Sequence, residues 1–483
     1  MSTYRLFKRS LAALKTEDET SLDHLYGELF RRGNDRYLVA DKKRGVVRQA
    51  LGFMREIARK YRFKVVKPEA SRILFYASSH NQYTSLWSTR AALKMKSLKS
   101  ILIVDIDIST EEESEKELGG LLDLHDLVSI RIVIVALLLF LIRIIPLLRI
   151  LKTDNNKNGI ASYLNYFFQA YIYIPLFIQN IHDISPCLTV TCNDHSLRNR
   201  SFRLASQVCR VKTLYMQHAS VSEIFPRLVF DYAFLDGRVA LDLYSGIGKK
   251  YPAQSDGMNI QTILFLTGQK KKIIRESKTR QVFIVGIGAN ILDDAEVIKK
   301  IALDIIMKDI EVHIRVHPSL GPGNKIFADL FNLSELYHLI KFTDPKNHTL
   351  SEYFSSIDIL IAGNTSLHLE AALAGVPTYY QEFGNHVNVY DYYGYVKNGV
   401  SKILPDNFAE LSLTQVKNLA VWEESRSEAL KVYSETFGTK WEHHEGRLSA
   451  ETIGHLLSNQ TFDDIYQPLA SDYGFAAVYA LRS

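Results

Sequence analysis

The segment IDILIAGNTSLHLEAALAGVPTYY, Ile357 to Tyr380, decides the fold class of this chain. Its opening run IDILIA has the length and branched content of a buried strand, and SLHLEAALAG has the length and pattern of a helix. Gly375 closes that helix and Pro377 stops it. A strand, a polar turn and a helix in this order predict a parallel sheet covered by helices.

One residue of this segment needs an explanation, because Glu370 is a carboxylate in an otherwise apolar helix. A capping box would place an acidic residue three positions after the cap, but His368 follows Thr365 at that spacing and Leu369 follows Ser366. On a helical wheel the carboxylate lies beside Leu367 and Leu373. We therefore expect Glu370 to have a polar partner, either in the chain or in a ligand.

The same alternation of strands and helices runs through most of the chain, in two similar halves. The first half has predicted strands at 73–77, 100–108, 187–191, 212–216 and 230–235. A polar region at 251–280 separates it from the second half, where 282–288, 311–316, 339–342 and the opening segment are predicted strands. Helices are predicted near 292–307 and 350–356. The pattern predicts two doubly wound α/β domains facing a cleft.

The length of 483 residues agrees with two domains and some additions. We predict a basic helical N-terminal extension over 1–70 and a first Rossmann-like domain over 71–260 that includes a hydrophobic helical insertion at 127–182. The second Rossmann-like domain is predicted over 281–445, followed by a C-terminal helix and tail over 446–483.

The charge of the chain is concentrated at its N-terminal end. The net charge is only +5, but the first 65 residues hold 16 Lys and Arg against 8 Asp and Glu. This excess is either a solvated helical surface or a surface attracted to anionic lipid or an acidic polymer. The aromatic and basic interleaving typical of nucleic-acid binding does not accompany it. Nucleic acid is therefore not an expected partner.

Two further observations bear on the location of the protein. Three cysteines at no metal-binding spacing favour a reduced, cytoplasmic protein, and the N-terminus has no apolar core typical of a signal peptide. The segment 127–151 is long enough to cross a bilayer, yet it contains Arg131, Arg143, Pro146 and Arg149. An interfacial helix with the aromatic segment 163–177 beside it fits better than a span, and two buried helices are the alternative.

Polar residues at the carboxyl ends of strands are the candidate ligand-binding residues, because ligands of such sheets bind there. The first half supplies Ser78, Ser79, His80 and Asn81, then Asn193 and Asp194, then Gln217, His218, Ala219 and Ser220. The second half supplies Gly286, Gly288 and Asn290, then Arg315, His317 and Pro318, and finally Gly363, Asn364, Thr365 and Ser366.

Among these residues, a donor-side set and an acceptor-side set can be distinguished. His317 ends a strand before a proline, and the hydroxyls of Thr365 and Ser366 follow the strand of the opening segment, which together suggest a phosphate-binding edge. Glu370 is then placed to accept hydrogen bonds from ribose hydroxyls. In the first half, His218 is a candidate general base oriented by Gln217 or Ser220, and Asp236 in the sequence FLDGR is a second candidate.

The motifs RVHP and GNTSLHLEAALAGVP resemble the donor half of GT-B glycosyltransferases of bacterial surface and capsular polysaccharides. His-Pro with a later hydroxyl pair is similar to bacterial sialyltransferases and polysialyltransferases, and QHAS with the later His-Pro is similar to CDP-glycerol glycerophosphotransferases. The resemblance covers roughly 193–380. One departure is that Leu235-Asp236-Gly237 has a single acid where sialyltransferases have an acidic pair.

The resemblance implies a glycosyltransferase that moves a sugar from a nucleotide-activated donor, with cytidine favoured, to a capsule or cell-surface polysaccharide or a glycolipid. It implies that His218 or Asp236 acts as the base and that His317 is catalytic. Donor nucleotide and phosphate would be held by Gly286, Gly288, Asn290, Arg315, His317, Asn364, Thr365, Ser366 and Glu370. On the acceptor side it implies Ser79, His80, Asn81, Gln217 and Ser220.

Transfer is expected to be independent of metal and of any other cofactor, at the inner face of a bacterial membrane and in contact with anionic lipid. A transferase of CDP-activated polyol phosphates for teichoic-acid-like polymers is the first alternative. A nucleotide-sugar 2-epimerase, which shares the two-lobed architecture, is the second, and a membrane scaffold without activity is the third.

Overall fold

The computed structural model describes residues 1–19, 21–22, 45–60, 63, 68–106, 118–153, 164–223, 225–250, 261–269, 273, 275, 282–291, 293–384, 390–469 and 472–482. The chain divides into two compact units. Unit 1 comprises Met1–His218, Glu223–Lys270 and Thr439–Ser483, and unit 2 comprises Ala219–Ser222 and Lys271–Gly438.

Unit 1 contains a sheet that, in the described residues, has the strand order β14-β15-β7-β6-β5-β4-β1-β2-β3. All neighbours are parallel except β14 and β15. The strands are β1 Ile73–Ala77, β2 Ser100–Val104, β3 Leu121–Asp123, β4 Leu188–Thr191, β5 Lys212–Met216, β6 Tyr232–Leu235, β7 Ile263–Leu266, β14 Tyr466–Pro468 and β15 Ala477–Leu481. The helices are α1 Thr3–Thr16, α3 Val46–Lys60, α4 His80–Met95, η2 Leu124–Asp126, α6 Ile130–Thr153, α8 Ala170–Ile184, α9 Leu197–Val208, α10 Arg238–Lys250 and α17 Glu445–Ser458.

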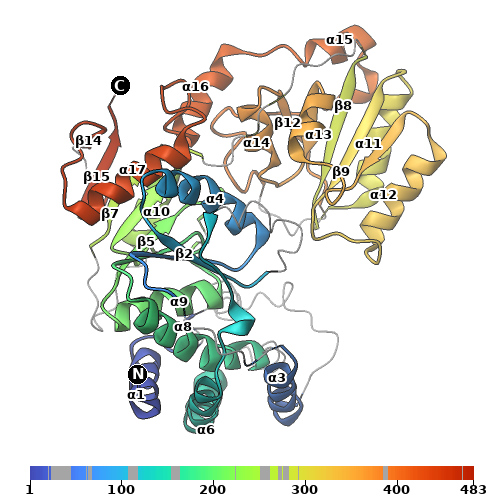
Figure 1. Ribbon diagram of the computed structural model, residues 1–483. Coiled ribbons are helices and arrows are strands. Elements are labelled where there is room, and N and C mark those ends of the chain that lie inside the picture. The colour runs from blue at the N-terminus through green and yellow to red at the C-terminus, as the bar shows by residue number, and fades with distance from the viewer. Residues whose placement is uncertain are drawn as a thin grey trace. The chain divides into compact units, whose positions relative to one another are not determined.

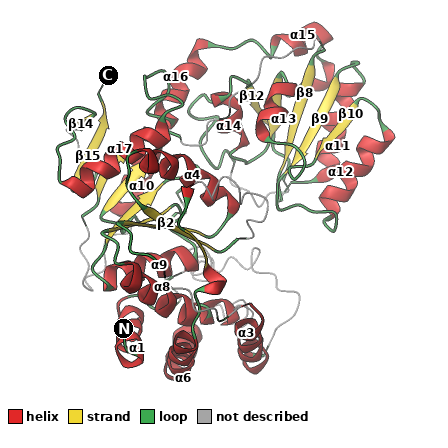
Figure 2. Ribbon diagram, in the orientation of Figure 1, coloured by secondary structure: helices red, strands yellow, loops and turns green. Residues whose placement is uncertain are grey.

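The two faces of this sheet are covered by different helices, as Figures 1 and 2 show. Because side chains alternate along a strand, Ile73, Phe75 and Ala77 of β1 join a core with α4 and α17. Leu74 and Tyr76 join the opposite core, which contains residues of α8 and α9. Beyond α8, the helices α1, α6 and α3 form an additional layer (Figure 1).

Unit 2 contains a parallel sheet with the strand order β10-β9-β8-β11-β12-β13 in the described residues. Its strands are β8 Ile284–Ala289, β9 Glu311–Val316, β10 Ile340–Thr343, β11 Ile359–Ala362, β12 Thr378–Tyr380 and β13 Ser401–Ile403. Its helices are α11 Ala295–Ile306, α12 Lys325–Leu336, α13 Leu350–Ser356, α14 Leu367–Leu373, η3 Phe408–Glu410, α15 Leu413–Asn418 and α16 Glu424–Tyr433. Residues of α11 and α12 form the core on one face of the sheet, and residues of α13 and α14 cover the other.

The structure differs from the predicted boundaries at the C-terminal end. Residues 446–483 were expected to form a helix and tail, but Thr439–Ser483 belongs to unit 1. There α17 packs on α4, and β15 pairs with β7. The strand β7 itself lies inside the region 251–280 that was expected to separate the halves.

The hydrophobic insertion contains α6, a short helical segment at 164–168 and most of α8 in its described part, and residues 154–163 lie outside it. Helix α8 is almost entirely buried, and Phe167, Phe168 and Tyr171 belong to the same core. The aromatic segment is therefore core, and its predicted interfacial position is wrong. Helix α6 is different, because only one of its sides is buried.

Candidate functional site

The carboxyl ends of β8 and β11 form the switch point of the sheet in unit 2. In chain order these strands are the first and fourth of the sheet and lie side by side, and the chain leaves them in opposite directions. Ligands of doubly wound sheets bind at this point. Two predicted residues meet here, because Asn290 follows β8 and its side-chain amide donates to the carbonyl of Asn364 after β11, at 2.8 Å.

The loop after β11 is held by its own polar groups. The side-chain oxygen of Asn364 accepts a hydrogen bond from the backbone N–H of Tyr392 at 2.8 Å. The hydroxyl of Thr365 accepts from the backbone N–H of Leu367 at 3.3 Å. The loop is therefore fixed in shape before any ligand binds.

A buried histidine in the helix that follows also holds this loop, through hydrogen bonds to two backbone carbonyls. The Nε2 atom of His368, in α14, lies 3.1 Å from the carbonyl oxygen of Ala362 and 3.0 Å from that of Gly363, so it carries a proton that it donates to them. Burial lowers the pKa of His368 to about 4, against the effect of these hydrogen bonds. His368 therefore remains neutral at ordinary pH and acts as a positioning residue.

Glu370 has partners within the chain. It is half-buried in the first turn of α14, and the hydroxyl of Ser366 donates to its Oε1 at 3.3 Å. Its charge also acts on Arg315, whose pKa is lowered by burial and raised in part by Tyr353 and Glu370. The carboxylate that the sequence left unexplained is thus partly satisfied by Ser366 and lies within the electrostatic influence of Arg315, and its role toward a ribose stays a prediction.

Three other predicted donor-side residues have visible packing roles. A guanidinium nitrogen of Arg315 donates to the carbonyl of His348 at 3.0 Å, which ties β9 to the start of α13. A Cβ on Gly286 would lie 2.5 Å from Ile357 and 2.8 Å from the Tyr353 hydroxyl, and one on Gly288 would lie 2.7 Å from Leu367. These glycines allow α13 and α14 to approach β8, and phosphate binding by them stays a prediction.

His317 is held in one orientation at the end of β9. Its backbone N–H donates to the carbonyl of Ala289 at 2.8 Å, so it adjoins the end of β8. Its Nδ1 accepts a hydrogen bond from the backbone N–H of Ser319 at 3.1 Å and lies 2.7 Å from the Ser319 hydroxyl. Burial lowers the pKa of this imidazole. The neutral ring therefore carries its proton on Nε2, where it is a donor suited to a phosphate oxygen.

The structure adds Asp293, which the sequence did not single out. It lies just after β8, and its Oδ2 accepts from the backbone N–H of Asn290 at 2.7 Å. Burial raises the pKa of its carboxyl to about 6, opposed by that hydrogen bond and helped by the charge of Glu382. A polar residue four positions beyond a strand is too common a feature to have marked it.

Replacing Asp293 by asparagine should remove a pH dependence of stability. The folded protein holds this proton more tightly than the unfolded chain, so the associated stability is lost as pH rises from about 4 through 6. The free energy of unfolding of Asp293→Asn, compared with that of the wild type at the same pH, should rise by roughly 2 kcal/mol between pH 4 and pH 8. Urea unfolding at both pH values measures this, and an unchanged difference between the two proteins would contradict it.

The carboxyl ends of β1 and β4 form the corresponding switch point in unit 1, and a buried polar network joins them. The side-chain amide of Asn199, in α9, donates to the hydroxyl of Ser78 at 2.8 Å, and its oxygen accepts from Thr191 at 2.6 Å. The side-chain carbonyl of Gln82 accepts from the backbone N–H of Ser78 at 3.0 Å. This network, which sequence reasoning missed, fixes the two strand ends relative to each other.

The predicted acceptor-side residues next to this network have different surroundings. Ser79 caps α4, its hydroxyl accepting from the backbone N–H of Gln82 at 3.4 Å, and His80 and Asn81 are exposed in the first turn. Ser220 belongs to unit 2, where its hydroxyl hydrogen-bonds to that of Tyr395. A hydrogen bond from Ser220 to His218 would have to replace this buried contact, and the predicted orientation of His218 by Ser220 stays a prediction.

The structure brings Gln217 and Asp236 together. The side-chain carbonyl of Gln217 accepts from the backbone N–H of Asp236 at 2.9 Å, which joins the ends of β5 and β6. Both residues are buried, whereas His218 is half-buried. The roles of His218 and Asp236 as bases stay predictions.

A hydrogen-bonded pair of an acid and a histidine lies at the end of β4. The Oδ1 of Asp194 accepts from Nδ1 of His195 at 3.0 Å, and its Oδ2 accepts from the hydroxyl of Tyr244 at 2.6 Å. Burial tends to raise the pKa of Asp194, but the hydrogen bonds and charge of His195 and the Tyr244 hydroxyl outweigh it, so the pKa is lowered. Asp194 is thus a buried carboxylate.

This arrangement leaves Nε2 of His195 as the basic nitrogen, because Nδ1 holds the proton shared with Asp194. The side-chain amide nitrogen of Asn193 donates to that Nε2 at 3.3 Å, and this hydrogen bond must open before Nε2 accepts a proton from a substrate. An imidazole oriented by a buried carboxylate is suited to accept a proton. Asn193 and Asp194 were recognised as strand-end residues, but only the fold brings in Tyr244, fifty positions along the chain.

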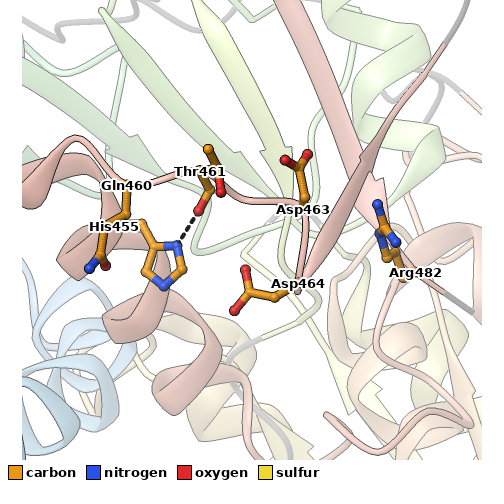
Figure 3. A pocket seen from close by; sticks show the side chains of 6 residues that line it. All are labelled: His455, Gln460, Thr461, Asp463, Asp464 and Arg482. Atoms are coloured by element: carbon orange, nitrogen blue, oxygen red, sulfur yellow. Dashed lines mark hydrogen bonds between the residues drawn. The ribbon is translucent and has the colours of Figure 1, made fainter.

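A pocket at the edge of unit 1 has less suitable chemistry (Figure 3). It is lined by His455, Gln460, Thr461, Asp463, Asp464 and Arg482. The two aspartates are exposed, and Nδ1 of His455 lies 2.6 Å from the carbonyl of Thr461. We interpret this pocket as a surface depression beside α17. Within the described part of the chain, no group of three or more His, Cys, Asp or Glu side chains is placed to hold a metal ion.

Comparison with known proteins identifies the fold. No protein-family model matches the sequence, and no curated protein matches it. Among solved structures, a candidate UDP-N-acetylglucosamine 2-epimerase from Listeria monocytogenes superposes with a TM-score of 0.52 at 10% identity. The superposition covers 81% of this chain and 98% of that one. The fold is GT-B.

Two further structures are similar at lower scores. The structure of MnaA from S. aureus with UDP has a TM-score of 0.49 at 12% identity and covers 80% of this chain and 96% of that one. The calicheamicin glycosyltransferase CalG4 has a TM-score of 0.47 at 12% identity and covers 80% and 98%. The predicted GT-B fold is confirmed, and the identities are too low to transfer a reaction.

Proposed function

We propose that this chain is an enzyme acting on a nucleotide-activated sugar, with the nucleotide bound at the β8–β11 switch point of unit 2. The observation that carries the proposal is the Asn290–Asn364 hydrogen bond, which holds the two strand ends beside the Nε2 donor of His317. That donor suits a phosphate oxygen, and the carboxylate of Glu370 suits the ribose hydroxyls.

Two reactions are candidates for this site, each supported by a different observation. Epimerisation at C2 of a nucleotide-bound N-acetylhexosamine is supported by the Listeria structure, whose described activity is of this kind. It requires groups that remove and return a proton, and the Asp194–His195 pair supplies such chemistry in unit 1.

Glycosyl transfer is supported by the strand-end motifs RVHP and QHAS. Under this candidate His218 or Asp236 activates an acceptor hydroxyl, and the acceptor is a capsule or surface polysaccharide of a bacterium. Transfer of a CDP-activated polyol phosphate has the same donor requirement. All these reactions need the same nucleotide site, so the proposal of that site does not depend on the choice between them.

Incubation with nucleotide sugars in the absence of an acceptor separates the two reactions. An epimerase converts UDP-N-acetylglucosamine to its C2 epimer under these conditions, which NMR detects in the sugar ring. A transferase leaves UDP- and CMP-activated sugars unchanged until an acceptor polysaccharide is added, and then releases the nucleotide.

Two substitutions then identify the base of the observed reaction. If His195 is the base, His195→Ala should lower turnover at least about 100-fold while His218→Ala has a small effect, and the reverse holds if His218 is the base. Turnover unchanged in both variants would contradict a role for either histidine. Circular dichroism of each variant controls for loss of the fold.

A further inference from the structure

The helix α6 in unit 1 has one buried side and one exposed apolar side. Its window Ile130–Ile150 is long and apolar enough to cross a membrane, but only 28% of it is buried within the protein. The exposed apolar residues are Ile130, Ile134, Leu138, Leu141, Ile142 and Ile145. At 100° per residue they fall within about 120° of the helix circumference. The buried residues Ile132, Val135, Ala136, Leu139 and Leu147 occupy the opposite side.

Helices α1 and α3 lie on either side of α6 (Figure 1). Helix α1 packs on both α6 and α8. Helix α3 contacts α6 through Phe53 and Phe140, whose ring centroids are 6.1 Å apart. These neighbours add exposed apolar side chains of their own, namely Tyr4, Val46, Val47, Leu51 and Met54. We call the exposed side chains of α1, α3 and α6 the three-helix face.

The charge of these helices is strongly positive. Each of the three contains four Lys or Arg residues, and Glu56 is the one acidic residue in their sequences. The exposed cations among the described side chains are Arg5, Lys8, Lys15, Arg48, Arg55, Arg131 and Arg149. Arg131 and Arg149 stand near the two ends of the apolar stripe of α6, about 27 Å apart at the helical rise. Long cationic side chains at such positions extend to lipid headgroups.

Two acidic residues that follow α1, Glu17 and Glu19, are turned inward and do not offset the exposed cations of these helices. Glu17 forms ion pairs with Arg200 and Arg203 of α9. Glu19 is fully buried, and its carboxylate accepts two hydrogen bonds from Arg143 of α6, at 2.7 and 2.9 Å. Among the described residues, the exposed cations of these helices are therefore not paired with Glu17 or Glu19.

The buried ion pair also fixes how α6 can meet a membrane. The hydroxyl of Tyr171, in α8, donates to Glu19 at 3.1 Å. Glu19 therefore holds Arg143 inside the domain and is itself held by α8. A helix crossing the bilayer would have to break this pair and expose Arg143 to hydrocarbon, which is costly. The helix can instead lie in the membrane plane with its exposed stripe in the lipid.

We propose that the three-helix face is a docking surface for a bilayer containing anionic phospholipid, with α6 lying parallel to the membrane plane. The apolar stripe enters the boundary between headgroups and acyl chains, and the cations around it contact the headgroups. The positive charge of the three-helix face attracts anionic lipid and disfavours a second copy of this chain, because two copies would bring the same positive charges together. The inference does not depend on which reaction the enzyme catalyses.

Vesicle flotation with the full chain tests the proposal. Vesicles of phosphatidylcholine and phosphatidylglycerol should carry the protein to the top of the gradient, and vesicles of phosphatidylcholine alone should carry at least tenfold less. Raising the salt concentration should weaken binding. The double variant Leu141→Asp and Ile145→Asp should lower the partition coefficient at least tenfold.

Matched variants make the result interpretable. Leu141 and Ile145 are 67% and 58% exposed, so unfolding midpoints should match the wild type. Met307→Asp, at an 85% exposed position in unit 2, should bind vesicles normally, and Arg149→Glu should weaken binding to anionic vesicles without entering the apolar stripe. Equal binding by the double variant, or equal binding to neutral vesicles, would overturn the proposal.

Two other occupants of the face would give different results. A dimer in sedimentation equilibrium that Leu141→Asp dissociates, without vesicle binding by the wild type, would show that the face joins two copies. Binding that neither high salt nor alkaline carbonate reverses would show insertion across the bilayer and overturn the in-plane orientation.

Discussion

Gly446→Ala should destabilise the protein by about 3 kcal/mol, because there is no space for a Cβ between α17 and α4. A Cβ at this position would lie 2.6 Å from the Cβ and hydroxyl of Ser88 and 2.7 Å from its backbone carbonyl carbon. Backbone atoms cannot give way as the end of a flexible side chain can, so the two helices would have to separate. The contact exists only because the C-terminal segment returns to unit 1.

Gly454→Ala is the matched control, since it makes the same chemical change in the same helix. A Cβ on Gly454 meets no atom within 4 Å. This variant should gain about 0.5 to 1 kcal/mol from the higher helix propensity of alanine. Urea unfolding of both variants gives the comparison. If Gly446→Ala is as stable as Gly454→Ala, the packing of α17 on α4 is wrong.

The sequence predicts the regular elements best where local pattern and final structure agree. The predicted strands 73–77, 212–216 and 311–316 and the predicted helix 350–356 have the bounds found in the structure. Segment 73–77 is a continuous apolar run, EVHIRV alternates polar and apolar residues, and the helix 350–356 begins with a capping box, all of which are local signals. Their alternation predicts doubly wound α/β domains, and the GT-B fold was implied by the resemblance of RVHP and GNTSLHLEAALAGVP.

Elements that depend on distant partners could not be predicted in the same way. The strand β15 pairs with β7, more than 200 positions earlier, and β14 has only three residues. The short apolar run of β7 stands in a polar region and becomes a strand because β6 and β15 lie on either side of it. Pairing between strands so far apart in the chain cannot be detected from the local sequence pattern.

The candidate site could likewise be predicted only in part from the sequence. Residues at the ends of strands could be identified from the sequence, which is why Asn290, His317 and Asn364 were found. Their partners could not, because Ser319 fixes the tautomer of His317 through a turn and Tyr244 reaches Asp194 from another helix. Glu370 was recognised as a carboxylate in need of a partner, but its hydrogen bond from Ser366 became visible only in the fold.

The central claim is that unit 2 binds a nucleotide through the Nε2 donor of His317. His317→Asn retains an acceptor for the Ser319 N–H but lacks the distal donor, whereas His317→Gln places an amide near the position of Nε2. A hydrogen bond to a charged phosphate contributes about 1.5 to 3 kcal/mol. Its loss in His317→Asn should therefore weaken binding roughly 10- to 100-fold, and His317→Gln should stay within a few-fold of the wild type.

Isothermal titration of the wild type and both variants with UDP, CDP and CMP is the most direct test. The account predicts that at least one of these nucleotides binds the wild type, that His317→Asn weakens its binding at least tenfold, and that His317→Gln largely restores it. Absence of binding by all three nucleotides, or equal affinity in the wild type and His317→Asn, would contradict the nucleotide site.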